Sequence, residues 1–246
     1  VDGKFVWTGG RLAGTGTATI NGLTQISFAN KSLDENRTLV LVGDTDWSGG
    51  SIFLGANAAF RLPAGSLVMN TGNTGIGGSP TNGVVDLQGT FRKTSTGNTT
   101  FSGTANFTLG GVIDVQAGNL VLSANTSVTG MLQAAGGAGI RFTGSNVSIP
   151  APNANTFTGA GTLELGGATL QFTGNLPIAS GNFTASSGTL LGNNTITVGG
   201  VFTLSGASLL GNGTIYANGT GRLTGAGTSI IADTRHVVVG GNTVWD

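Results

Sequence analysis

The chain has 246 residues, of which 46 are Gly, none is Cys and only 8% are charged, whereas average domains carry roughly 25% charged residues and about 7% Gly. The 38% of hydrophobic residues are evenly spread, which excludes a charged disordered tail, and Gly follows no three-residue period, which excludes collagen. Ten basic and ten acidic side chains give a formal net charge of zero, and this argues against nucleic acid as a partner because phosphate binding needs a cationic face.

Other classes are excluded by what the sequence lacks. Without Cys, disulfides and thiolate metal sites cannot form. No run of about 18 apolar residues occurs, so no membrane span is expected. Residues 1–4 do not read as a signal peptide, so for an exported protein we expect the signal to have been removed or to lie outside this sequence.

Charged residues are unevenly placed along the chain. Those between Lys93 and Asp233 are Asp114, Arg141, Glu164 and Arg222. We therefore expect this half to be kept soluble by Thr, Ser and Asn, or to be covered by other subunits.

In chain order, irregular loops are predicted at residues 70–83, rich in Gly, Asn, Ser and Pro, and at residues 150–156, which hold two Pro. The rest alternates short strands with turns. Residues 161–165 and 195–198 place apolar side chains at every second position, so one set points inward. Gly and Asn between such runs turn the chain because both tolerate positive φ. No stretch has helical periodicity with caps.

A 19-residue repeat is clearest between residues 182 and 228. It aligns residues 190–196 with 209–215, 183–184 with 202–203, and 203–207 with 222–226. Residues 168–170 align with 188–190 at an offset of 20. This period is too short for helix-pair repeats and is typical of one coil of a parallel β-solenoid.

The predicted fold class is therefore all-β, with residues 1–246 forming one parallel β-solenoid domain of coils of about 19–20 residues. About twelve such coils, stacked about 4.8 Å apart, would form a rod roughly 55–60 Å long. Inward ladders of Val, Leu, Ile and Phe would make its stability approximately a sum of nearest-neighbour terms.

The two ends of the chain also resemble one another. Residues 10–17 match 221–228 at an offset of 211, and residues 37–47 match 235–245 at an offset of 198. We therefore expect the chain to be about one unit of a repeat of about 200 residues, cut from a tandem array or stacked end to end on other copies. Neither end contains a recognisable cap, and an uncapped solenoid exposes strand edges that can template another chain.

These patterns resemble a known family. Residues 89–101, 111–122 and 159–163, with the Trp-Thr/Ser-Gly-Gly motifs at Trp7 and Trp47, are similar to the Gly/Thr-rich repeats of large secreted bacterial surface proteins, the autotransporter-passenger and filamentous-haemagglutinin-like β-solenoids. The resemblance covers most of the chain. It implies export to the cell surface, a parallel β-helix, and adhesive or scaffold roles, and it carries no catalytic residues.

Catalytic residues are not indicated by the sequence itself. Many parallel β-helix enzymes act on polysaccharides through paired carboxylates, but Asp86, Asp114 and Glu164 are single and far apart in sequence. Stacking could bring Asp86 near Asp114, although their separation of 28 residues is no multiple of the repeat. The one histidine, His236, sits in a Val-rich strand and is expected to face solvent. We expect no enzyme and no cofactor.

A metal site is not predicted either. The one dense acidic region holds Asp34, Glu35, Asp44 and Asp46. Loop carboxylates can bind Ca²⁺, but the Ca²⁺-binding nonapeptide of other β-rolls is absent. Turn and solvated-surface roles are therefore preferred.

Thr and Asn recur in patterns that could reflect function. Thr-x-Thr pairs begin at Thr15, Thr17, Thr94 and Thr195, but Thr197 aligns with Tyr216, which breaks a flat Thr ladder of the ice-binding kind. Sequons of the Asn-x-Ser/Thr type begin at Asn30, Asn36, Asn98, Asn106, Asn125, Asn146, Asn182, Asn193, Asn212 and Asn218. Glycan attachment is possible in a suitable host, but structural Asn at repeated turns is the preferred interpretation.

Trp7, Trp47 and Trp245 each belong to the repeat pattern. An exposed Trp could stack on sugar rings, but Trp at corresponding positions of a repeat is expected to be a core residue or a turn anchor.

Two functional hypotheses follow. The first is a structural, non-catalytic block of an extracellular fibre, sheath or stalk whose partner is itself, head to tail. The second is an adhesin shaft that binds glycans or a surface, and a polysaccharide-active enzyme is a weaker third. The neutral composition and the matching ends favour the first.

Overall fold

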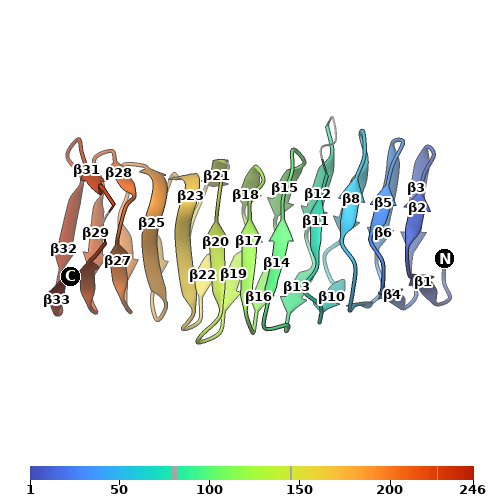
Figure 1. Cartoon of the computed structure of the whole chain (residues 1–246), viewed down its shortest axis with the longest axis horizontal. Coiled ribbons are helices and arrows are strands. Elements are labelled where there is room, and N and C mark those ends of the chain that lie inside the picture. The colour runs from blue at the N-terminus through green and yellow to red at the C-terminus, as the bar shows by residue number, and fades with distance from the viewer. Residues whose placement is uncertain (79–81, 145, 226) are drawn as a thin grey trace.

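The computed structural model describes residues 1–78, 82–144, 146–225 and 227–246. All regular structure in these ranges is β-strand, so no helix is present that could cross a membrane. Short strands wind into a rod whose chain termini lie at opposite ends of its long axis (Figure 1). All strand pairs are parallel, and the predicted parallel β-solenoid is confirmed.

Each coil gives strands to three parallel ladders, here called faces 1, 2 and 3. Face 1 consists of β1 (Phe5–Trp7), β4 (Thr24–Ile26), β7 (Thr45–Trp47), β10 (Leu67–Asn70), β13 (Thr90–Lys93), β16 (Val112–Val115), β19 (Met131–Ala134), β22 (Phe157–Thr158), β24 (Leu176–Ile178), β26 (Ile196–Val198), β29 (Thr214–Ala217) and β32 (His236–Val239). These twelve strands number coils 1 to 12 from the N-terminus.

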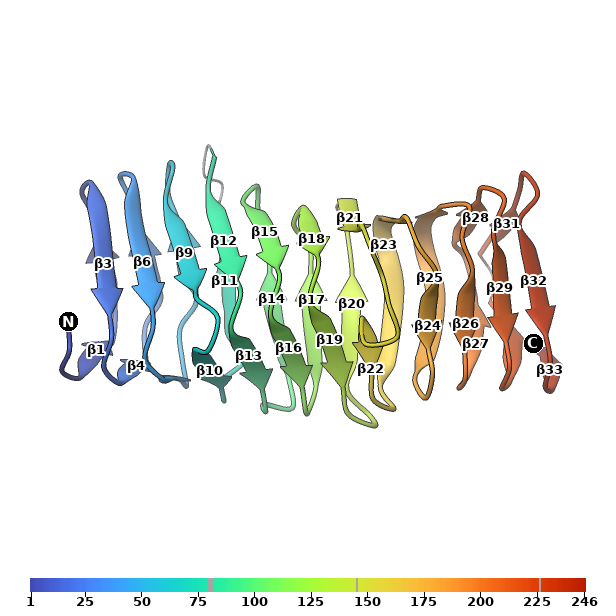
Figure 2. The ribbon, with the colours of Figure 1, turned by 180° about the vertical axis from the view of Figure 1, so that it is seen from behind.

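Face 2 consists of β2 (Gly10–Leu12), β5 (Lys31–Leu33), β8 (Ile52–Leu54), β11 (Gly75–Gly77), β14 (Asn98–Phe101), β17 (Asn119–Leu122), β20 (Gly139–Phe142), the first parts of β23 (Thr162–Phe172) and β25 (Asn182–Leu191), β27 (Phe202–Leu204), β30 (Gly221–Leu223) and β33 (Thr243–Trp245). Face 3 consists of β3 (Gly16–Ile20), β6 (Arg37–Leu41), β9 (Ala59–Leu62), β12 (Val84–Leu87), β15 (Asn106–Leu109), β18 (Thr126–Val128), β21 (Asn146–Ile149), the later parts of β23 and β25, β28 (Ser208–Leu210) and β31 (Ile230–Ile231). Figure 2 shows the stack from behind, with β3, β6 and β9 side by side.

Three corners connect the faces: corner 1 joins face 1 to face 2, corner 2 joins face 2 to face 3, and corner 3 leads to the next coil. Residues related by the 19-residue sequence repeat pair with one another on neighbouring coils. Leu190 pairs with Leu209 and Ile196 with Ile215, while Thr169 pairs with Thr189 at the predicted offset of 20.

The coil length varies more widely than the repeat suggests. Paired residues are about 21 positions apart on average, but Leu132 pairs with Phe157, 25 positions on. The extra residues form the predicted loop at 150–156, in corner 3. The predicted loop at 70–83 is interrupted by β11, and its residues 79–81 lie outside the described residues. Strand pairing fixes the faces and leaves corner length free.

Inward side chains form one continuous apolar core. Coil 5 places a Phe on each face: Phe91, Phe101 and Phe107. Their ring centroids lie 5.2 Å and 5.3 Å apart in turn, and Trp47 packs edge-on against Phe91 at 6.4 Å. Offset and edge-on arrangements of this kind are the favoured ones for aromatic rings.

Glycine is required at corner 3 where backbones approach closely. A Cβ on Gly130 would lie 2.0 Å from the carbonyl oxygen of Gly111, and one on Gly111 would lie 2.0 Å from that of Gly89. Because these clashes are with backbone, no rotamer change can relieve them. The high Gly content is thus partly a consequence of coil stacking.

The matches between the two ends differ in their place on the coil. Residues 10–12 and 221–223 both lie on face 2, as β2 and β30. Residues 37–47 instead cover faces 3 and 1, whereas residues 235–245 cover faces 1 and 2. The second match therefore does not join equivalent coil positions, and the longer repeat stays a prediction.

Replacing Phe101 by Ala should lower the free energy of unfolding by about 3–5 kcal/mol, because it removes buried surface and leaves a cavity between Phe91 and Phe107. Urea denaturation would measure the loss. Thr100→Ala, on the same strand but facing outward, should change it by less than about 0.5 kcal/mol. Equal effects of the two changes would contradict the inward assignment.

Candidate functional site

The three carboxylates considered for catalysis lie on three different faces. Asp86 is on face 3, Asp114 on face 1 and Glu164 on face 2. Each binds an Arg of the preceding coil, with N–O distances of 3.1 Å from Arg61, 2.7 Å from Arg92 and 2.7 Å from Arg141, respectively. Stacking therefore does not bring Asp86 near Asp114, and these residues offer no carboxylate pair for glycoside cleavage.

The ion pairs follow one rule that sequence reasoning missed: an Arg binds a carboxylate of the following coil. Two further pairs obey it, Arg11 with Asp34 and Glu35, and Arg222 with Asp246. In all five cases an acid stands 22 to 25 residues after the Arg, which is a signal that could have found them. Exposed pairs contribute about 0–1 kcal/mol each, so their main effect is to neutralise the outer faces.

The carboxylates of the acidic region are divided between three parts of the coil. Asp34 and Glu35 lie at corner 2 and bind Arg11, whereas Asp44 lies at corner 3 and Asp46 on face 1. The described residues contain no group of three His, Asp or Glu side chains that could hold a metal ion. The histidine, His236, is exposed at the start of β32 as predicted.

The prediction for the Trp residues holds for two of the three. Trp7 and Trp47 are buried, and the Trp47 indole N–H donates to the Gly50 carbonyl at 2.8 Å, which anchors corner 1. Trp245 is wrong as a core residue because its side chain is 75% exposed. It occupies the inward position that follows Leu223, but no later coil of this sequence packs over it.

Buried cations line corner 1, a feature that the sequence did not reveal. The Lys31 ammonium donates to the carbonyls of Ser27 (2.9 Å), Ala29 (2.5 Å) and Gly49 (3.1 Å). The Lys93 ammonium donates to the Ser95 carbonyl, the Ser95 hydroxyl (2.8 Å) and the Ala117 carbonyl (3.0 Å). Neither is paired with a carboxylate in the described part of the chain. Burial lowers the pKa of Lys93 to about 8 and also lowers that of Lys31.

Buried lysines with lowered pKa are often functional, but these two are enclosed. Between them along corner 1, Asn70 donates to the Thr74 hydroxyl at 2.6 Å and accepts from the Thr99 hydroxyl at 2.7 Å. The inward Lys31, Asn70 and Lys93 side chains thus donate hydrogen bonds to carbonyl and hydroxyl groups of corner 1. This arrangement supports a structural role, because a buried carbonyl without a partner is costly.

The asparagines of several sequons bind the backbone of the following coil. Asn30 accepts from the Ser51 N–H at 2.9 Å, Asn182 from Val201 at 2.8 Å and Asn193 from Asn212 at 3.0 Å. These bonds support the structural interpretation of the repeated Asn. The Thr ladder is broken where predicted, because Thr197 pairs with Tyr216.

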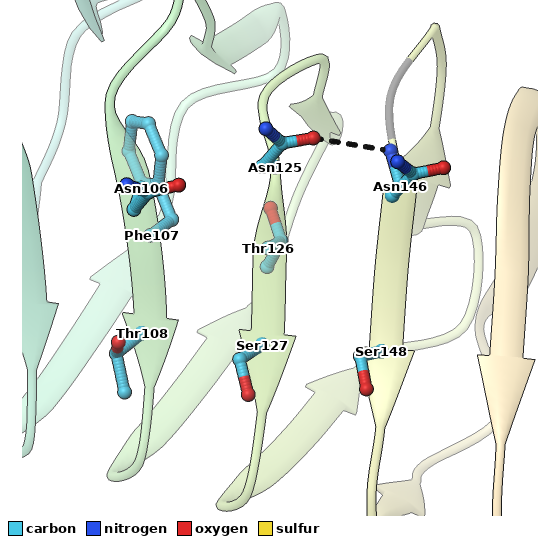
Figure 3. Close-up of a pocket in the computed structure, with 8 residues that line it drawn as sticks. All are labelled: Asn106, Phe107, Thr108, Asn125, Thr126, Ser127, Asn146 and Ser148. Carbon is cyan, nitrogen blue, oxygen red and sulfur yellow. Dashed lines mark hydrogen bonds between the residues drawn. The ribbon is translucent and has the colours of Figure 1, made fainter. Parts of the chain in front are cut away.

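Three sequons stack in register on face 3, over coils 5 to 7. Their outward side chains line a shallow hollow of about 360 Å³ and are uncharged (Figure 3). Asn125 accepts from the Asn146 N–H at 3.4 Å. This surface holds only hydroxyl and amide groups, with no exposed aromatic ring, and it is consistent with a hydrated outer face.

Large exposed apolar side chains gather near the two ends of the rod. Among the described residues they are Val1, Val6, Leu23, Phe28, Val42, Phe53, Tyr216, Ile230, Ile231, Val238 and Trp245. All therefore lie on coils 1 to 3 or on coils 11 and 12. Several of them, including Val6, Phe53 and Tyr216, point outward from their strands, so the open end of a coil stack does not by itself explain their exposure.

Comparison of the chain with protein-family models, with curated proteins and with solved structures found no match in any of the three.

Between about pH 8 and 10.5 the unfolded chain keeps the Lys93 proton that the folded chain has released, so stability should rise with pH in this window. Lys93→Met should remove much of this rise. Urea unfolding at pH 7, 8, 9 and 10 would measure it. Lys4→Met, the same substitution at an exposed lysine, should leave the rise in the free energy of unfolding with pH in place. An unchanged rise in Lys93→Met would contradict the lowered pKa of Lys93.

Proposed function

We propose that this chain is a structural, non-catalytic building block of a bacterial surface fibre, sheath or stalk, in which β-solenoids stack end to end outside the cell. The observation that carries the proposal is the confinement of large exposed apolar side chains to coils 1–3 and 11–12 of the described chain. The described residues of the coils between them carry no large exposed apolar side chain, and inward-column residues near the C-terminal end, such as Ile231 and Trp245, would be covered by an end-to-end contact. The partner in this proposal is a further solenoid unit of the same kind, either a second copy of this chain or an adjoining tandem repeat.

The strand edges at the two ends support head-to-tail stacking. β1, β2 and β3 pair on one side, with β4, β5 and β6, and β31, β32 and β33 pair with β28, β29 and β30. Unpaired edges of this kind are templates for another chain. A contact between two different ends of a rod does not close on itself and therefore generates a filament.

Inward residues of the terminal coils would be covered by such a contact. At the C-terminal end, Ile231 and Trp245 continue the inward columns of Leu209 and Leu223 and are exposed. At the N-terminal end, Phe5 and Leu12 are half-buried against the core. Docking of one end on the other would bury these side chains, and burial of apolar surface favours association.

The outer charges support close lateral neighbours. The five Arg residues on the outer faces are each neutralised within their own chain, for example Arg92 by Asp114 and Arg141 by Glu164. Copies in a fibre or sheath would then approach one another without strong repulsion.

Negative-stain electron microscopy across a concentration series should show unbranched filaments that lengthen as concentration rises. Twelve coils at about 4.8 Å predict an axial repeat of about 58 Å. Isolated rods of about that length at every concentration would contradict self-assembly.

The variant Trp245→Lys should shorten or abolish the filaments because it places a charge at the end-to-end contact. Thr184→Lys introduces the same charge on an outward position of face 2 on coil 9, away from both ends, and should leave filaments intact. Equal loss in both variants would argue against the contact between ends. Far-ultraviolet circular dichroism would check that both variants keep their strands.

A second function, glycan binding by the shaft of an adhesin, is favoured by a separate observation: Phe53 is an exposed aromatic residue beside polar groups on face 2.

A further inference from the structure

The outward column of face 2 changes in side-chain size and polarity over the first four coils. Arg11 pairs with Ser32, Ser32 with Phe53, and Phe53 with Gly77. Phe53 is 43% exposed although it stands in the middle of its strand. A Cβ on Gly77 would lie 3.9 Å from the Phe53 ring, so a side chain there would cover part of it. Small residues on both neighbouring coils therefore leave the ring open.

A shallow groove of about 370 Å³ lies beside this ring. The residues that line it are Gly10, Arg11, Asn30, Lys31, Ser32 and Phe53. The Ser32 hydroxyl makes no hydrogen bond to any described residue. Asn30 uses its carbonyl oxygen to accept from the Ser51 N–H, which leaves its amide NH₂ free to donate. The groove thus combines an aromatic surface with unused donors and acceptors.

Of the two cations that line the groove, Lys31 directs its ammonium to the carbonyls of corner 1, and Arg11 is paired with two carboxylates. Arg11 donates from Nε to Asp34 at 2.9 Å and from Nη2 to Glu35 at 2.5 Å, and Glu35 in turn accepts from the Gly14 N–H at 3.1 Å. A guanidinium held by two carboxylates does not attract an anion. It still presents N–H groups and carboxylate oxygens to hydroxyl groups of a ligand.

The strands beside this groove have no unpaired backbone edge to which a peptide strand could bind. β5 and β8 each pair on both sides, β5 with β2 and β8, and β8 with β5 and β11. Strand addition needs an unpaired edge, which this lateral face lacks at these coils. A ligand of this groove must therefore be recognised by its apolar face and its hydroxyl groups.

We propose that this groove binds a neutral saccharide, an inference that rests on the second function proposed above and gives it a site, with the Phe53 ring against the apolar face of one sugar ring and with Ser32, Asn30 and the Arg11 cluster bonded to its hydroxyls. Strand spacing of about 4.8 Å along the rod is close to the length of one sugar residue in an extended chain. The saccharide therefore lies along the axis of the solenoid, across coils 1 to 3.

The same coils hold a second displayed aromatic. Phe28 is 80% exposed at corner 1 of coil 2 and has a φ of 62°, a backbone conformation that is unfavourable for a bulky residue. Its counterpart Gly49 on the next coil has no room for a side chain, since a Cβ would lie 2.9 Å from the Phe28 nitrogen. Strained residues of this kind cluster at binding sites.

Saturation-transfer NMR with cellotriose, maltotriose and triacetylchitotriose would test the proposal. At least one of the three trisaccharides should bind to the unchanged chain at millimolar concentration. Phe53→Ala should weaken that binding by about tenfold or more, as expected for an aromatic anchor, and Phe53→Trp should retain it. Circular dichroism would show that both variants remain folded, since the ring faces outward.

Tyr216→Ala is the matched control, because Tyr216 is also 43% exposed but lies on face 1 of coil 11. It should leave the binding unchanged. Absence of binding for all three trisaccharides would overturn the proposal. So would binding that survives in Phe53→Ala, or that falls equally in Tyr216→Ala. None of these outcomes bears on filament formation, which uses the ends of the rod.

Discussion

The parallel backbone ladder between successive coils is the constraint on which the rest of this structure depends. Because each strand between the end coils hydrogen-bonds to the same face of the coils before and after it, each side chain stands above its counterpart one coil away. An inward position between the end coils is then buried by its own column, whereas most outward positions keep part of their surface in contact with solvent. Stability becomes approximately a sum of coil-to-coil terms, which permits corners of unequal length as long as the three ladders stay in register.

The same ladder explains how the sparse polar and charged groups are used. An outward Arg finds its carboxylate one coil later, as Arg92 does with Asp114, and Asn side chains bind the backbone of the following coil, as Asn182 does with Val201. Inward Lys31 and Lys93 donate to corner carbonyls that the ladders leave without partners. Few charges therefore remain free, and the outer faces are neutral over most of their length.

A neutral shaft with distinctive ends suits a protein whose contacts are made at particular places. The end coils carry exposed apolar residues such as Ile231 and Trp245. The first coils also carry Phe53 on a lateral face. The two proposals, stacking through the ends and saccharide binding on face 2, use separate surfaces and are compatible in one surface fibre.

The sequence by itself determined the fold class, the parallel coils and the local register, because strand alternation and the 19-residue similarity are carried by neighbouring residues and by adjacent coils. It also gave the burial of Trp47 and the break in the Thr ladder at Tyr216. Only the tertiary structure decided which non-repeated residues of neighbouring coils contact one another. Corner length varies from coil to coil, so these contacts cannot be predicted from a repeat of constant length. That variation placed Asp86 and Asp114 on different faces, and contacts within corner 1 enclosed Lys93.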